Sequence, residues 1–173
     1  MAGGKEITTK IRSIENTKKV TSALEMVSAS KIRKSQDLMA ETRPYAQMIR
    51  RVMGHLSKAR PEYRHPFTVR REEIKKVGYI VVSTDRGLCG GLNINLFKQI
   101  LASIQEWQAK DATVSLVTLG KKASAFFKNI NVEIAATASD LGEKPQIEDL
   151  IGSIKVMLDA YREEKLDRVY IVY

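Results

Sequence analysis

Apolar and small side chains recur through the first third of the chain at steps of three and four residues. This spacing places them on one face of a helix, in the heptad pattern typical of helices that pair with another helix. The seam continues to Leu56, and its first half consists of Ile7, Ile11, Ile14, Thr17, Thr21, Leu24 and Ser28. We therefore predict a long N-terminal helix over residues 1–58 that forms half of a coiled coil.

The middle of this seam carries small and hydroxylated residues. Thr17, Thr21 and Ser28 stand where Leu or Ile would normally pack. Small side chains let a neighbouring helix approach closely, but they bury little apolar surface. The pattern predicts a close contact with a partner helix that is held only weakly.

Pro44 is the only proline in the predicted helix. It removes the hydrogen bond to the Ala40 carbonyl and disfavours helical geometry at Arg43. We predict a kink at this position, and a break into two helices is the alternative.

The pattern changes after residue 76. Residues 59–76 contain Pro61, Pro66 and a dense run of charges, which is typical of a linker. Beyond it, the predicted strands cover residues 77–83, 113–119, 132–136 and 169–173, and the predicted helices cover residues 94–107, 122–128 and 147–164. We expect Asn93 to cap the first of these helices.

Alternating strands and helices imply right-handed crossovers and a mostly parallel sheet covered by helices. The predicted fold class is therefore α/β, with a long N-terminal coiled-coil helix followed by a Rossmann-like, mostly parallel α/β domain over residues 77–173. The last helix is expected to turn six residues inward: Leu150, Ile151, Ile154, Met157, Leu158 and Tyr161. Because Tyr173 lies in or directly after a predicted strand, we expect this domain to be truncated.

The net charge of +9 is concentrated in the predicted helix. Residues 1–60 contain 13 Lys and Arg against 5 Asp and Glu, a balance of +8, whereas residues 61–173 contain 16 against 15, a balance of +1. The basic residues wind around the helix, which suits an acidic protein partner that surrounds it. A solvated helix surface is one alternative. Nucleic acid is another, although aromatic interleaving and a recognition motif are absent.

The stretch STDRGLCGGLN, residues 83–93, follows the first predicted strand and precedes a helix. An open α/β sheet usually binds its ligand at this position, and a nucleotide-binding Rossmann-like enzyme is therefore one hypothesis. However, neither standard glycine-rich fingerprint is present. The alternative is a tight turn, with Asp85 and Arg86 pairing locally or across an interface.

Cys89 is the only cysteine, which excludes an internal disulfide and fits a reducing compartment. A thiol at a helix start can act as a nucleophile, but neither His55 nor His65 is near it in sequence or has metal-ligand spacing. We predict no catalytic residues, cofactor or metal. The N-terminus lacks a secretory signal and no run of about 18 apolar residues spans a membrane. We therefore expect a cytoplasmic protein that reaches membranes only through partners.

Two stretches resemble one protein family. The sequence IRSIENTKKVTSALEMVSASK, residues 11–31, resembles the N-terminal helix of the gamma subunit of bacterial F-type ATP synthase. The loop over residues 83–93 is similar to that family's loop after the first strand of its α/β domain. The resemblance covers essentially the whole chain, and both stretches are long enough to be highly specific.

The resemblance implies a central-stalk rotor subunit that is not itself catalytic. In the family, the N-terminal helix pairs with a C-terminal helix inside a ring of alpha and beta subunits. The α/β domain meets the epsilon subunit and the c-subunit ring. Rotation couples proton translocation to ATP synthesis on the beta subunits. These features imply a peripheral location on the cytoplasmic face of the bacterial inner membrane.

The resemblance also implies which residues face other subunits, and it leaves no role for nucleic acid. The candidate interface residues are Lys10, Lys18, Lys19, Leu24, Arg33, Asp85, Arg86 and Cys89. The family continues beyond the position of Tyr173 into its C-terminal helix. Without that helix, we expect the exposed seam to fray or to pair with another copy of the chain.

Overall fold

The computed structural model describes residues 2–59, 65–69, 71–142 and 145–173. Contacts between Cα atoms divide the chain into two compact units, Met1–Tyr63 and Arg64–Tyr173. The predicted linker over residues 59–76 includes residues 60–64 and 70, which lie outside the described residues.

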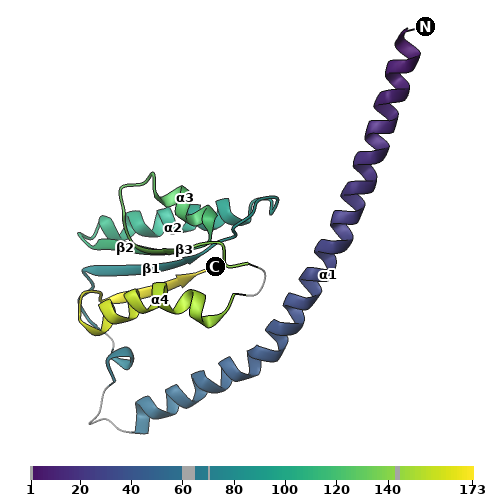
Figure 1. The fold of residues 1–173 in the computed structure, drawn as a ribbon. Helices are drawn as coiled ribbons and strands as arrows, with labels where there is room; N and C mark the ends of the chain where they lie inside the picture. The colour runs from purple at the N-terminus through teal and green to yellow at the C-terminus, as the bar shows by residue number, and fades with distance from the viewer. Residues whose placement is uncertain (1, 60–64, 70, 143–144) are drawn as a thin grey trace. The chain divides into compact units, whose positions relative to one another are not determined.

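Helix α1 runs without interruption from Ala2 to Ala59 (Figure 1). Its 58 residues correspond to roughly 90 Å at the usual rise of about 1.5 Å per residue. Ala, Met, Glu, Lys and Arg recur along it, and all of these residues favour helical geometry. Every residue from 3 to 56 is exposed. The predicted long helix is confirmed. From residue 3 to residue 56, its apolar side chains are exposed and are not buried in a hydrophobic core.

Pro44 lies inside α1 and does not end it. The alternative of two separate helices is therefore wrong, and a single curved helix passes through this position (Figure 1). Near the proline, the Thr42 hydroxyl donates hydrogen bonds to the carbonyl oxygens of Leu38 at 3.1 Å and Met39 at 3.2 Å. Proline and a hydroxyl that bonds back to the preceding turn both favour bending of a helix.

The second unit alternates strands and helices after a short 3-10 helix at Pro66–Thr68. Its elements are β1 (Lys76–Val82), α2 (Leu92–Gln108), β2 (Thr113–Leu119), α3 (Lys121–Phe127), β3 (Glu133–Ala138), α4 (Ile147–Arg162) and β4 (Arg168–Val172). The predicted element order is confirmed, and most boundaries differ from the prediction by one or two residues.

The four strands form one parallel sheet in the order β3-β2-β1-β4. Tyr79 in the central strand β1 lies opposite Leu116 of β2 and Tyr170 of β4. The chain moves outward from β1 to β3 and then crosses back to β4 on the other side of β1. This order is that of a Rossmann-like sheet, and the predicted fold class is confirmed.

Helices cover both faces of the sheet, with α2 and α3 on one face and α4 on the other (Figure 1). On the first face, Tyr79 and Val81 pack in a cluster with Phe97, Ile100 and Phe127. The second cluster joins Ile80, Val117 and Leu119 of the strands to Met157 of α4 and to Leu166. Both faces of β1 are therefore buried, which explains its continuous apolar run.

Two sequence predictions about the helices are wrong. Asn93 does not cap α2, because α2 begins at Leu92 after Gly91 and Asn93 is buried in its first turn. Ile151 and Leu158 do not face the core, because both side chains are exposed. The apolar arc of α4 is wider than the part that the sheet covers, and periodicity alone cannot show which part is covered.

Candidate functional site

The seam of α1 is open along its whole predicted length. Its apolar members Ile7, Ile11, Ile14 and Leu24 are exposed. Its hydroxyl groups are already used within the helix: Thr17 donates to the Ser13 carbonyl at 3.0 Å and Thr21 to the Thr17 carbonyl at 2.8 Å. These threonines need no hydrogen-bond partner from another helix. The seam therefore suits close packing of small and apolar groups.

The apolar surface of α1 is wider than the seam predicted from sequence. Val20, Met26 and Val27 are also exposed, and Val20 and Val27 lie one heptad apart beside Leu24. The heptad spacing predicts only the single row of seam positions. The signal for the wider surface is the spacing of Val20 and Val27, which lie four and three residues from Leu24.

The basic candidates Lys10, Lys18, Lys19 and Arg33 are all exposed on α1. At about 100° per residue, positions 10, 18, 19 and 33 point in several directions around the helix axis. One flat partner surface could not contact all four of these side chains at once. Their distribution fits a partner that approaches the helix from more than one side.

Asp85 joins three segments of the α/β unit. One carboxylate oxygen accepts from the backbone N–H of Lys121 at 2.8 Å, and the other accepts from the N–H of Leu141 at 3.1 Å. The bond from Lys121 is the main reason that the pKa of Asp85 lies below its ordinary value. This residue holds the loop after β1 against the start of α3 and the loop after β3. Its predicted contact with another subunit is not tested by this geometry.

The buried side chain of Asn93 holds the two ends of the loop together. Its amide nitrogen donates to the Thr84 hydroxyl at 2.8 Å and to the Cys89 sulfur at 3.2 Å, and its oxygen accepts from the Thr84 N–H at 3.3 Å. Cys89 is half-buried, and the structure places it inside this network. The sequence places Asn93 and Cys89 in one loop. The predicted role of Asn93 as a helix cap is wrong, because its side chain bonds to Thr84 and Cys89.

Arg86 and Leu88 are both exposed side chains of the loop. Leu88 is fully exposed and has a positive φ of 65°, which is uncommon for a residue other than glycine. Asp85 and Asn93 fix the loop on either side of it. The sequence does not single out Leu88, because a motif shows neither the exposure of a side chain nor its backbone conformation.

The loop does not present an arrangement for nucleotide chemistry. Its polar groups at Ser83, Thr84, Asp85 and Asn93 already bind protein atoms. Within the described residues, no three His, Cys, Asp or Glu side chains are placed to hold a metal ion. In the same part of the chain, none of the helices is long and apolar enough to cross a membrane.

A scan against protein families matches residues 3–173 to the ATP synthase family. The chain belongs to the family of ATP synthase gamma chains. It is 59% identical over 173 residues to the ATP synthase gamma chain of Xanthomonas campestris pv. campestris (strain B100). It is 57% identical to that of Xanthomonas axonopodis pv. citri (strain 306) and 58% identical to that of Stenotrophomonas maltophilia (strain K279a).

The matches to these gamma chains cover all of this chain but only 60% of each relative. The chain therefore spans about three-fifths of the length of the curated relatives. The resemblance drawn from residues 11–31 and 83–93 is confirmed at the level of the family. The same match gives no support to a nucleotide-using enzyme or a nucleic-acid-binding protein.

Proposed function

We propose that this chain supplies part of a central-stalk rotor subunit of F-type ATP synthase. The observation that carries this proposal is α1, a 58-residue helix in which every residue from 3 to 56 is exposed, in a chain of the gamma family. A shaft that turns inside a ring must be long, continuous and able to contact its surroundings from several sides. Its rotation couples proton translocation to ATP synthesis.

The seam of α1 pairs with a second long helix in the whole subunit. The small residues Thr17, Thr21 and Ser28 allow the two backbones to approach closely, and the apolar residues above and below them supply the buried surface. Because the threonine hydroxyls are satisfied within α1, the pairing leaves no buried donor without a partner at these positions.

The basic outside of α1 faces acidic segments of the beta subunits. Lys10, Lys18, Lys19 and Arg33 contribute through charge, and Leu24 through apolar contact. On the α/β unit, the loop after β1 presents Arg86, with Asp85 and Cys89 supporting it from within. Exposed charges of this kind contribute more to orientation and specificity than to affinity.

The subunit itself is not catalytic, because the chemistry belongs to the beta subunits. Its α/β unit meets the epsilon subunit and the c-subunit ring. The protein is therefore peripheral to the cytoplasmic face of the bacterial inner membrane. We propose no cofactor, and no nucleic acid partner.

The proposal is tested by assembling the full-length gamma chain with the other subunits in inverted membrane vesicles. The double substitution Leu24→Asp and Val27→Asp places one carboxylate on the seam and one on the apolar surface beside it, where burial without a partner is costly. We expect ATP-driven proton pumping to fall at least fivefold while ATP hydrolysis on the beta subunits continues. Ser22→Asp, which adds a carboxylate to α1 outside the seam, is the matched control.

Two results would reject the rotor function. One is a full-length gamma chain that assembles with neither alpha nor beta subunits. The other is unchanged proton pumping in the double variant, with the assembled complex present in normal amount.

A further inference from the structure

The two faces of the sheet are covered unequally. Helices α2 and α3 lie on one face, whereas among the described residues α4 is the only α-helix on the other (Figure 1). On that second face, Ile80 of β1 is buried, but its register partner Ile171 of β4 is 65% exposed. Parallel sheets normally have both faces covered by helices. The cover of the second face is therefore incomplete over β4 in this chain.

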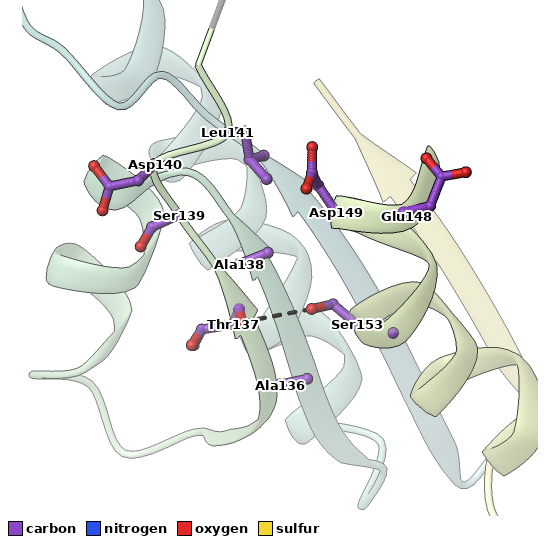
Figure 2. A pocket seen from close by; sticks show the side chains of 10 residues that line it. Ala136, Thr137, Ala138, Ser139, Asp140, Leu141, Glu148, Asp149 and Ser153 are labelled. Atoms are coloured by element: carbon purple, nitrogen blue, oxygen red, sulfur yellow. Dashed lines mark hydrogen bonds between the residues drawn. The ribbon is translucent and has the colours of Figure 1, made fainter. Parts of the chain in front are cut away.

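The flank of α4 that faces β3 is polar where it meets the sheet. Asp149, Gly152 and Ser153 lie on this flank and line a cavity of about 500 Å³ together with the end of β3 (Figure 2). Ser153 donates a hydrogen bond to the Thr137 carbonyl at 3.4 Å, and the Asp149 carboxylate accepts from the Gln146 N–H at 2.9 Å. The polar groups of this flank are thus bonded within the chain.

The opposite flank of α4 carries an apolar stripe, which consists of Ile147, Ile151, Ile154 and Leu158. At about 100° per residue, the stripe covers about 60° of the helix circumference and lies away from the cavity. Its spacing of four, three and four residues is that of a helix that meets another helix. Ile147, Ile151 and Leu158 are 74%, 56% and 42% exposed. Within the described residues, no helix covers this stripe.

The stripe and β4 form the wall and the floor of one groove. At one end, Leu158 lines a cavity of about 290 Å³ with Val169 of β4 and with Phe67, which stacks on Tyr161 at a ring-centroid distance of 5.5 Å. These contacts show that the stripe faces β4. Because α4 connects two parallel strands, it runs opposite to them, and its first turns lie toward the end of β4 where Ile171 is exposed.

The groove is apolar along its length, and its ionic groups are gathered at the end near Phe67. There, Arg71 pairs with Asp167 at 3.1 Å and donates to the Tyr161 carbonyl at 2.8 Å. Arg168 is the remaining charged residue of that lining. Permanent interfaces are more apolar than transient ones. The surface therefore suits an occupant that stays in place.

We propose that a helix from the remaining part of the gamma chain lies in this groove, beside α4 and over β4. The matches cover only 60% of each relative, so about two-fifths of a gamma chain lies outside them. The helix packs its apolar side against Ile151 and Leu158 and on Ile171 below, and it gives the second face of the sheet two helices, like the first. The proposal rests on membership of the gamma family and does not use the seam of α1.

Cysteine labelling compares this 173-residue chain with the full-length gamma chain. Ile151→Cys and Ile171→Cys each place a thiol in the groove. We expect a maleimide to label both at least tenfold more slowly in the full-length chain, because the helix excludes the reagent. Val156→Cys is the matched control, since Val156 is 42% exposed on the other flank of α4 and should be labelled equally fast in both chains. The unsubstituted chains give the background from Cys89.

Charged substitutions test whether the groove is packed. Ile151→Lys should lower the melting temperature of the full-length chain by about 4 °C or more, because the lysine would have to be buried. The same change should have little effect on the 173-residue chain, where residue 151 is exposed. Val156→Lys should have little effect on either chain.

Several results would overturn this proposal. They are equal labelling of Ile151→Cys in the two chains and equal losses of melting temperature from Ile151→Lys. Protection that appears only after the other subunits are added would assign the groove to a partner instead, and protection that increases with protein concentration would assign it to a second copy. Because none of these measurements involves proton pumping, failure here is distinguishable from failure of the rotor function.

Discussion

Asp85 holds three backbone segments together through one carboxylate, and this makes its contribution to stability depend on pH. Asp85→Ala removes the acceptors for the N–H groups of Lys121 and Leu141. Since the side chain is partly solvated, we expect a loss of about 1 kcal/mol in the free energy of unfolding near pH 7. Arg86→Ala, at the neighbouring exposed position, should change the stability by much less.

The direction of the pH effect follows from the lowered pKa of Asp85. The ionised form is favoured in the folded state, so the stabilisation is fully present above the unfolded pKa of about 3.9. It is lost as the pH falls through the lower folded pKa. Urea unfolding curves of the wild type and Asp85→Ala should therefore converge below about pH 4. A constant difference from pH 7 to pH 3 would contradict this role of the carboxylate.

Two features require glycine at position 120: its positive φ and the close approach of the Ser83 backbone. Its φ is 103°, and a Cβ atom there would overlap the carbonyl oxygen of Ser83. We expect Gly120→Ala to destabilise the α/β unit by about 3 kcal/mol or more, because it adds a steric clash to backbone strain. Gly142→Ala is the control, since φ is 70° but the space around it is open. Thermal unfolding should show a much smaller loss for Gly142→Ala, and equal losses would rule out the clash with Ser83.

At the scale of elements, α4 contains a glycine, Gly152, in its interior, where packing within this chain leaves room for a side chain. Gly152→Ala introduces a methyl group into open space in the middle of a helix. We expect it to raise the free energy of unfolding by about 0.5–1 kcal/mol, because alanine is the better helix former. Chemical denaturation measures this change. A loss of stability would mean that Gly152 has a structural role within this chain.

Helix α1 shows how much of an element can be read from spacing and composition. Its length and seam were predicted because helix formers and heptad spacing are local properties of the sequence. The width of its apolar surface was underestimated, since Val20 and Val27 lie beside the chosen row. The sequence left open whether Pro44 would interrupt the helix, and the structure shows α1 continuing through it, with the Thr42 hydroxyl bonded to the carbonyls of Leu38 and Met39 in the preceding turn.

At the scale of the whole molecule, α1 exposes large apolar side chains along its length, from Ile7 through Leu24 and Leu38 to Leu56. We expect the isolated chain to self-associate through the seam or to fray along α1. Sedimentation equilibrium and amide hydrogen exchange measure these two outcomes. A strictly monomeric chain with full protection of the amides from Ile7 to Leu38 would contradict this expectation.

A substitution distinguishes association through the seam from other contacts. Leu24→Asp introduces a carboxylate into the seam and should lower the association constant at least tenfold, because the charge would have to be buried. Ser22→Asp changes the same helix outside the seam and should have little effect. Equal effects of the two changes would show that net charge, and not the seam, governs the association.

The sequence by itself determined the long basic helix, the order of strands and helices in the α/β unit, and the family. All three depend on local periodicity or on contiguous stretches such as residues 11–31 and 83–93. Only the tertiary structure decided that Asn93 lies inside the loop network, that Asp85 joins three segments, and that Ile151 and Leu158 remain uncovered. These properties depend on contacts between segments far apart in the chain, which local spacing does not encode.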